Sequence, residues 1–411
     1  MKPQSPGGAR RILLADADAF FVAVARMVDP EGAGKEPLLI VGGTRESRGV
    51  VCSASYEARK FGVRSAMSIA HALRLCPDAM CVPVPGRACR EKSREIRAVL
   101  ERYAPVVEGA SVDEWYMDLG GTEGMYNNEP LAETSRKIRA SVADETKLSV
   151  SIGGGTTKLV AKLAVERAKP KPGTGATGVH VVPVGEEAVF LETFELAEIP
   201  MIGPRFQERL AALGMRRVPD VLQYDVPTLA QWLGKREAVW LYDRVRGIDG
   251  REVESHGDAK SISRDDTFSH DIDDDDELMR ELLALITRAA HDLRGDGMTA
   301  RTITVRIRDF DFKTRQASRT LDTPVISDRV ILEVARTLFR KLRNARRVPA
   351  RLLGVGLSSL TIDSTADQLT LFERRDRKED ETDRDRVLAR TIDKVREKFG
   401  DKGILPARLI D

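Results

Sequence analysis

The sequence predicts a multidomain protein of the α+β class, and three observations support this prediction. The chain has 411 residues, which is enough for two to four domains with cores of their own. Residues 11–168 and 264–361 alternate short apolar strands with helices, whereas residues 179–250 contain only short helices separated by proline and glycine. We therefore expect a helical segment between two mixed α+β units.

The composition is typical of a soluble globular protein with a heavily charged surface, since 42% of the residues are hydrophobic and 32% are charged. No apolar run approaches the roughly 20 residues that span a bilayer, and the N-terminal sequence MKPQSPGGARR lacks the apolar segment of a secretion signal. The four cysteines form no CxxC pair and have no histidine cluster nearby. These features predict a reduced cytoplasmic protein without structural zinc.

Charge is distributed unevenly along the chain, although the net charge of +2 does not by itself indicate a nucleic-acid-binding protein. Residues 337–351 carry six Lys or Arg and no acid, and residues 271–277 are acidic except for Ile272. Residues 373–386 are charged at every position except Thr382. Mixed charge at this density buries no core, so we expect a solvated linker there.

The first half of the chain predicts strands and helices in alternation. The apolar run at residues 12–15 is typical of a central strand, and Asp18 is placed to cap a helix over residues 19–28. The further predicted elements are a strand pair at 37–43 and 49–54, hairpin strands at 106–112 and 115–119, a strand at 148–154, and helices at 56–62, 68–76, 131–146 and 157–169.

The second half predicts short helices, then a compact module, then a last helix. Residues 189–215 indicate helix, turn and helix, and residues 256–263 indicate a linker between domains. The β-α-β-β-α-β order within residues 264–361 is typical of a two-layer α+β domain. We expect the final amphipathic helix, at residues 384–399, to fold back onto the protein through an apolar stripe formed by Leu388, Ile392, Val395 and Phe399.

Three carboxylates form the first candidate site. Asp16 ends the predicted central strand, and Asp113 and Glu114 lie at the predicted hairpin tip, where a turn or bulge would let both face the same side. Three carboxylates meeting at one point repel each other and need a cation, and oxygen ligands without His or Cys favour Mg²⁺ or Mn²⁺ over zinc. The alternative is that Asp16 starts a helix and the other two are exposed turn acids.

Basic and phenolic side chains form a second group. Tyr56 and Arg59 lie at i and i+3 on one face of a short helix, where a phenol beside a guanidinium suits a terminal phosphate. Lys158, Lys162 and Lys169 share a stripe on a later helix. The alternatives are a surface Tyr–Arg pair and three solvated lysines.

Four motifs together resemble a known family. They are DADAFF at 16–21, YEARKFGVRSAM at 56–67, SVDEWYMD at 111–118 and KLVAKLAVERAKPKPG at 158–173. In order and spacing they resemble the Y-family DNA polymerases, the translesion class, and look closest to its DinB branch. The resemblance extends over roughly residues 11–361.

The resemblance implies a right-hand polymerase with an extra domain. Its expected parts are a palm at 1–27 and 86–178, fingers at 28–85, a helical thumb with a helix-hairpin-helix at 179–250, a linker at 251–263, an α+β little finger at 264–361, and at 362–411 a tail with a clamp-binding motif, a charged linker and the final helix.

The resemblance also implies roles for the residues of both candidate groups. Asp16, Asp113 and Glu114 would be catalytic and hold two Mg²⁺ ions, or Mn²⁺, with the backbone carbonyl of Ala17 as a further ligand. Phe21 occupies the steric-gate position, where a flat ring under the sugar favours deoxynucleotides. The other residues expected around the incoming dNTP are Phe20, which we place in the core, Ser53 with Cys52 over the nascent base pair, and Tyr56, Arg59 and Lys169 at the triphosphate.

Two segments are expected to contact primer-template DNA. The helix-hairpin-helix IPMIGPRFQERLAALGM would offer backbone N–H groups to a phosphate near Gly203. In TITVRIR, Ile303 and its alternate neighbours would face the helices, which leaves Arg306 and Arg308 on the open face towards DNA. The alternative for this strand is an edge strand protected by its arginines.

The sequence QLTLF at 368–372 resembles the motif by which bacterial polymerases bind the sliding clamp. Gln368, Leu369, Leu371 and Phe372 would make that contact, which raises the local concentration of the enzyme at a primer end. The alternative is that the apolar residues fold back onto the protein itself.

Four positions depart from the family pattern. Ala25 replaces a usual Glu, Thr157 a usual Asn, Trp115 a small residue and Met201 a turn glycine. None of them removes an expected metal ligand or triphosphate contact.

We therefore expect a monomeric, template-directed translesion DNA polymerase of bacterial type, working at the nucleoid in the cytoplasm. Two other classes of protein fit the sequence less well. A non-catalytic accessory subunit of the same fold would lose the three acids, which are retained here. A nucleotide cyclase on a palm-like sheet would explain neither the thumb nor QLTLF.

Overall fold

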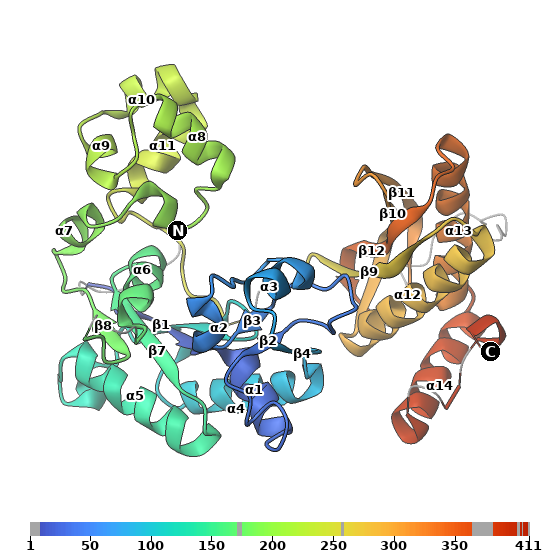
Figure 1. Cartoon of the computed structure of the whole chain (residues 1–411), viewed down its shortest axis with the longest axis horizontal. Helices are drawn as coiled ribbons and strands as arrows, with labels where there is room; N and C mark the ends of the chain where they lie inside the picture. Colours follow the sequence, from blue (N-terminus) through green and yellow to red (C-terminus); the bar gives the residue numbers. More distant parts are fainter. Residues whose placement is uncertain are drawn as a thin grey trace, which may run out of the picture. The chain divides into compact units, whose positions relative to one another are not determined.

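The computed structural model describes residues 9–170, 175–255, 259–363, 381–400, 403, 404 and 406–409. The chain forms two compact units, Met1–Arg45 with Val50–Gly257, and Glu46–Gly49 with Asp258–Asp411 (Figure 1). We call them the N-terminal and the C-terminal unit. Within the part of the chain that is described, no helix is long and apolar enough to cross a membrane.

A five-stranded sheet forms the centre of the N-terminal unit. Its order is β5 (Val106–Gly109), β6 (Glu114–Asp118), β1 (Ile12–Ala17), β7 (Val150–Gly155) and β8 (Val179–Val181). The central strand β1 is antiparallel to both β6 and β7, and all six of its residues are buried. The prediction of a central strand and of a hairpin around Asp113–Glu114 is therefore confirmed.

Alternation along β1 sends its side chains to two different cores. Leu13 and Ala15 pack with α1 (Phe20–Val28), α4 (Gly86–Leu100) and α5 (Leu131–Thr146). Ile12 and Leu14 lie on the other face, where α6 (Lys158–Ala168) covers the sheet. Because the side-chain period of a strand is two, Asp16 belongs to the α6 face.

A smaller three-stranded sheet lies beside this core, in the order β3 (Ser53–Ala54), β2 (Leu39–Val41) and β4 (Met80–Val82). It packs with α2 (Tyr56–Lys60) and α3 (Ile69–Leu75) around a core that includes Ile40 and Ile69. The antiparallel pairing of β2 with β3 confirms the predicted strand pair.

The rest of the N-terminal unit is helical, as its proline and glycine punctuation predicts. After η1 (Glu123–Tyr126), which lies between β6 and α5, the remaining elements are α7 (Glu187–Glu192), η2 (Leu196–Glu198), α8 (Pro204–Ala212), α9 (Val218–Leu222), α10 (Val226–Leu233) and α11 (Lys235–Arg244). Leu159 and Leu163 of α6 join their apolar core.

The C-terminal unit has two layers. Its antiparallel sheet has the order β11 (Thr314–Val325), β10 (Met298–Asp309), β12 (Ala350–Ile362) and β9 (Ser261–Ile272), and the helices α12 (Asp275–Gly295) and α13 (Asp328–Ala345) cover one face. This is the predicted two-layer module. β9 begins at Ser261, inside the segment expected to be a linker, because Ile262 pairs with Leu357 and is buried.

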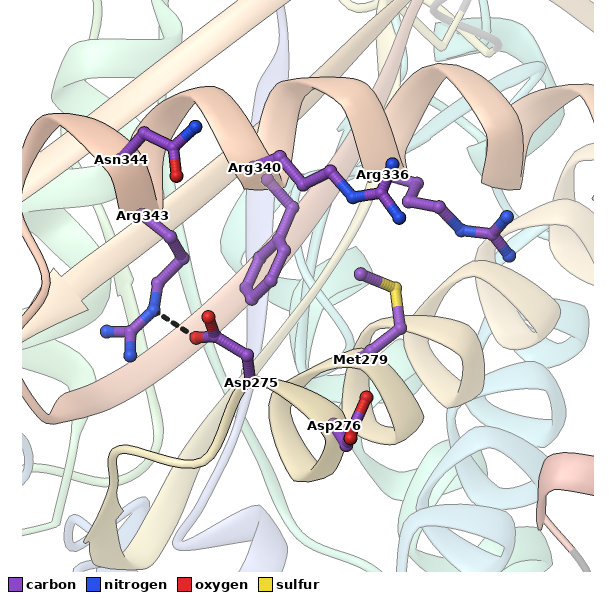
Figure 2. A pocket seen from close by; sticks show the side chains of 8 residues that line it. Asp275, Asp276, Met279, Arg336, Arg340, Arg343 and Asn344 are labelled. Atoms are coloured by element: carbon purple, nitrogen blue, oxygen red, sulfur yellow. Dashed lines mark hydrogen bonds and ion pairs between the residues drawn. The ribbon is translucent and has the colours of Figure 1, made fainter.

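The basic stretch 337–351 is partly used inside this unit. A cavity of about 270 Å³ lies between the two helices. Figure 2 shows that Arg336, Arg340 and Arg343 of α13 line it opposite Asp275 and its neighbours on α12. Arg343 has a side chain only 2% exposed and pairs with Asp275, so it holds the two helices together.

The final helix, α14 (Asp383–Phe399), lies on the C-terminal unit, and η3 (Ala407–Leu409) follows it. The contact differs from the prediction, because Leu388 and Phe399 of the apolar stripe are 56% and 66% exposed. Asp393 is buried instead and accepts hydrogen bonds from Arg294 on α12, one of them 2.9 Å long. Charge pairing therefore sets the rotation of α14.

Arg294 is the centre of this contact. Its side chain is 4% exposed and pairs with both Asp393 and Asp328, and it also donates to the carbonyl of Ile326. Burial raises the pKa of Asp393, but hydrogen bonding from Arg294 and His291 outweighs this effect and lowers the pKa overall. The carboxylate is thus ionised at neutral pH and holds the helix in place.

Replacing Asp393 with alanine should release α14. The substitution leaves a buried guanidinium with Asp328 as its remaining carboxylate, so we expect docking to weaken by about 3 kcal/mol, the low end for a broken buried pair. Hydrogen exchange of the α14 amides measures the release, with the exposed Lys394→Ala as the control. Unchanged protection in Asp393→Ala would contradict the assigned contact.

Candidate active site

The sheet of the N-terminal unit brings Asp16 and Glu114 together. The two residues are paired across β1 and β6, and the register runs from Ile12 opposite Asp118 to Asp16 opposite Glu114 without a shift. The N–H of Ala17 continues the ladder by donating to the carbonyl of Asp113 at 2.9 Å. Asp16 and Glu114 therefore share the α6 face because they are opposite each other, and Asp113 lies in the turn between β5 and β6.

Each carboxylate on this face is paired with a lysine. Lys169 lies 2.9 Å from Asp16, Lys162 pairs with Glu114, and Lys158 lies 2.6 Å from Glu108. The lysine stripe thus faces the sheet and its carboxylates, and the alternative of three solvated lysines is wrong. Sequence reasoning missed Glu108, whose only signal was its position on the strand next to β6.

Burial dominates the electrostatics of Asp16. Loss of hydration raises the pKa of this carboxyl to about 7, and the nearby Glu114 adds to the rise while Lys169 opposes it. Although burial disfavours its charge, the carboxylates of Asp16 and Glu166 raise the pKa of Lys169. The site therefore favours additional positive charge beside Asp16.

Asp113 stands slightly apart from the other two acids. It lies just before β6, and its carboxylate accepts a hydrogen bond from the hydroxyl of Ser111. Among the described residues, no three Asp, Glu, His or Cys side chains are close enough to hold a metal ion, so the expected common point of three carboxylates is not formed. The donor set nevertheless fits Mg²⁺ or Mn²⁺, because it consists of carboxylate and carbonyl oxygens at the ends of β1 and β6.

The side chains expected at the triphosphate gather next to these acids. The N-cap residue Ser55 starts α2, which carries Tyr56 and Arg59, and the guanidinium of Arg59 lies 5.2 Å from the Tyr56 ring centre. Burial raises the pKa of Tyr56 and the carboxylate of Asp18 adds to the rise, while Arg59 and Lys169 oppose it. These residues therefore share one electrostatic environment.

A cavity of about 320 Å³ opens beside Tyr56. Asp18 and Ala19 line it from the end of β1, Arg26 from α1, and Pro170 from the segment after Lys169. Sequence reasoning gave Arg26 no role. Ser53, expected over the base pair, is 5% exposed on β3.

The two phenylalanines after β1 occupy different environments. Phe20 is 2% exposed in the core, as expected, whereas Phe21 is half-buried at the edge of that core. Their rings meet edge to face with centroids 5.6 Å apart. The core thus fixes Phe20, and Phe20 supports the ring of Phe21.

Asp18 does not cap α1, so that prediction is wrong. The N-cap position is Ala19, with a φ of 47° and no side-chain cap. Asp18 lies beside β7 instead, where its carboxylate accepts hydrogen bonds of 2.8 Å from the hydroxyls of Ser149 and Ser151. These two serines therefore fix the turn between β1 and α1.

Trp115, the departure next to the acids, is 1% exposed and fills the core behind them. In register it lies opposite Ala15 on β1 and Gly109 on β5. Both neighbours are small, which leaves room for the indole on the core face of the sheet. The pairing of Glu114 with Asp16 next to it is regular.

The surfaces expected to meet DNA have the predicted patterns. Gly203 is the N-cap of α8, and Met201 before it has a φ of 74° and is 75% exposed, the backbone conformation that a turn glycine would adopt. In β10, Ile303, Val305 and Ile307 are fully buried, and the alternation leaves Arg306 and Arg308 on the open face. β10 is an internal strand, so the edge-strand alternative is wrong.

The open face around β10 is polar and slightly hollowed. A shallow cavity of about 300 Å³ runs over it, and glycines 354 and 356 lie next to Arg306 and Thr304 in register. Arg306 is 3.1 Å from Asp265, and Thr304 shares a hydrogen bond with Ser318. The clamp residues Gln368, Leu369, Leu371 and Phe372 lie outside the described residues.

Comparison with known proteins supports the resemblance. Residues 15–166 match the model of the impB/mucB/samB family, and residues 259–371 match its C-terminal domain. The chain is 35% identical over 399 residues to DNA polymerase IV of Dehalococcoides mccartyi strain CBDB1, covering 97% of each chain. It is 34% identical over 364 residues to DNA polymerase IV of Staphylococcus aureus strain JH9, covering 89% of this chain and 99% of the relative.

Solved structures agree. A Y-family DNA polymerase chimera of Dbh and Dpo4 matches with a TM-score of 0.73 at 26% identity, over 86% of this chain and 99% of that one. DinB from Sulfolobus solfataricus matches with a TM-score of 0.57 at 28% identity and the same coverage. The chain therefore belongs to the DinB-type Y-family DNA polymerases and is a DNA-directed DNA polymerase of the translesion class.

Proposed function

We propose that the N-terminal unit joins dNTPs to a primer by a two-metal-ion nucleotidyl transfer. The primer 3′ oxygen attacks the α-phosphorus, the bond to the β-phosphate oxygen breaks, the hydroxyl proton passes to water, and pyrophosphate leaves. Two Mg²⁺ ions, or Mn²⁺, would stabilise the attacking and leaving oxygens. The pairing of Asp16 with Glu114 beside Tyr56, Arg59 and Lys169 is the observation that carries this proposal.

The residues would share the work as follows. Asp16, Asp113, Glu114 and the carbonyl of Ala17 supply the oxygen ligands, and burial of Asp16 makes additional positive charge favourable there. Tyr56 and Arg59 would hold the triphosphate together with Lys169, which now pairs with Asp16. Positioning and charge neutralisation would therefore provide most of the rate enhancement.

Asp113 tests the assignment with the least effect on folding, since it lies outside the buried ladder pair. Asp113→Ala should lower primer extension roughly a thousandfold while primer-template affinity is retained. The matched control is Asp118→Asn, at the far end of β6, whose carboxylate accepts a hydrogen bond from the N–H of Gly120. Extension at the wild-type rate by Asp113→Ala would refute the site, and primer extension also separates this proposal from a cyclase or a non-catalytic subunit.

We also propose that Phe21 excludes ribonucleotides, because it occupies the steric-gate position of the family and its ring packs edge to face against the buried Phe20. Phe21→Ala should raise ribonucleotide incorporation roughly tenfold or more relative to deoxynucleotides. Competition between dNTP and rNTP on one template measures the ratio, and Phe61→Ala, with a ring that is 53% exposed, is the control. A ratio equal to that of the wild type would rule out a gate at this position.

Binding of primer-template DNA is proposed at two surfaces. The hairpin before α8 would offer the N–H groups around Gly203 to a phosphate. The open face of β10 would place Arg306 and Arg308 against the DNA backbone. The shallow cavity over β10, which is lined by serine and threonine hydroxyl groups, leaves room for that backbone.

Recruitment by the sliding clamp is proposed from the sequence QLTLF alone. A Leu371→Ala/Phe372→Ala variant should lose the stimulation of extension by the clamp and keep clamp-independent extension. Undiminished stimulation in that variant would exclude this motif as the contact.

A further inference from the structure

The tip of the β10–β11 hairpin exposes two aromatic rings. Phe310 and Phe312 lie between the end of β10 at Asp309 and the start of β11 at Thr314, and they are 48% and 64% exposed. Neither ring belongs to the core of the C-terminal unit. Two exposed rings that lie two residues apart at a hairpin tip indicate a binding surface.

Ion pairs and backbone hydrogen bonds at its base hold the hairpin tip in place. Asp309 is fully buried and pairs with Arg315, with a shortest distance of 2.7 Å, and with Arg346. The N–H of Phe312 donates to the carbonyl of Asp309, and the N–H of Phe310 donates to the carbonyl of Pro349. Because this network fixes the backbone, the rings are presented in a defined position and lose little freedom on binding.

Phe312 adopts a backbone conformation that costs energy. Its φ is 65°, in the left-handed region where glycine or asparagine is favoured over a bulky residue. Strain of this kind persists where a side chain is needed for function. Phe312 therefore stands at a position whose backbone favours glycine, and its ring is kept there at a cost in strain.

The surroundings of the rings are cationic. The guanidinium of Arg351 lies 4.6 Å from the centre of the Phe312 ring, and Lys313 between the two strands has a side chain that is 71% exposed. Lys313 is 3.7 Å from Asp311, but the charge of Asp311 is already met by Arg346 at 2.9 Å. A partner with flat rings and negative charge complements such a surface.

We propose that this tip binds single-stranded DNA, with unpaired bases stacked on Phe310 and Phe312 and phosphates beside Lys313 and Arg351. Base stacking on aromatic side chains needs no particular sequence, and basic side chains follow the backbone. This inference extends the DNA binding proposed above and rests on it. It adds a contact with unpaired nucleotides, apart from the open face of β10 and from the palm.

The test uses the whole chain and a fluorescent oligothymidine of about 20 nucleotides, with a blunt duplex of equal length for comparison. Phe310→Ala/Phe312→Gly should bind the oligothymidine about tenfold more weakly and the duplex within about twofold of the wild type. Glycine at 312 suits the positive φ, so folding should be unaffected. Phe312→Tyr should keep the affinity, as should Leu388→Ala, which removes a side chain of similar exposure on α14.

Salt dependence separates stacking from charge. The ring variant should leave the slope of affinity against salt unchanged, whereas Lys313→Ala/Arg351→Ala should flatten it by roughly one phosphate contact or more. Oligothymidine affinity that is unchanged in the ring variant would overturn the proposal and point to a protein partner for the rings. Equal losses on both DNAs would also overturn it. A wild type that binds neither DNA would refute the proposed function as well.

Discussion

The antiparallel pairing of β1 with β6 is the constraint on which the candidate active site depends. It places Asp16 opposite Glu114, and alternation along the strands then sends both to the face that α6 covers. The same ladder puts Trp115 into the opposite core, between Ala15 and Gly109. A shift of one residue in this register would exchange the two faces and bury the carboxylates among leucine and methionine side chains.

The sequence predicted what depends on periodicity and motif, and failed where long-range pairing decides. Periodicity correctly predicted the buried strand at 12–15 and the alternation of buried and open positions around Ile303. It also predicted the helical middle of the chain. Asp is a residue type that often caps helices, which explains the wrong prediction for Asp18. Its actual partners, Ser149 and Ser151, lie about 130 residues away and could not be inferred from the sequence. The lysine stripe on α6 was visible, whereas its carboxylate partners were not.

The C-terminal unit shows the same limit for charge. A count of basic residues in 337–351 does not distinguish Arg343, which is buried against Asp275, from Arg351, which lies beside an exposed ring. Likewise, the periodicity of residues 384–399 correctly predicted the helix α14. The prediction that its apolar stripe forms the contact was wrong. Buried ion pairs set a unique orientation where apolar contacts alone permit several.

The lysines at the site have a consequence for how the protein tolerates lack of metal. Lys162 and Lys169 act as counter-ions for Glu114 and Asp16, so the charge of these carboxylates is partly compensated before any cation or nucleotide arrives. We therefore expect the protein to fold without bound metal. A chelator would silence such an enzyme and leave its architecture intact, ready for reactivation when divalent ions return.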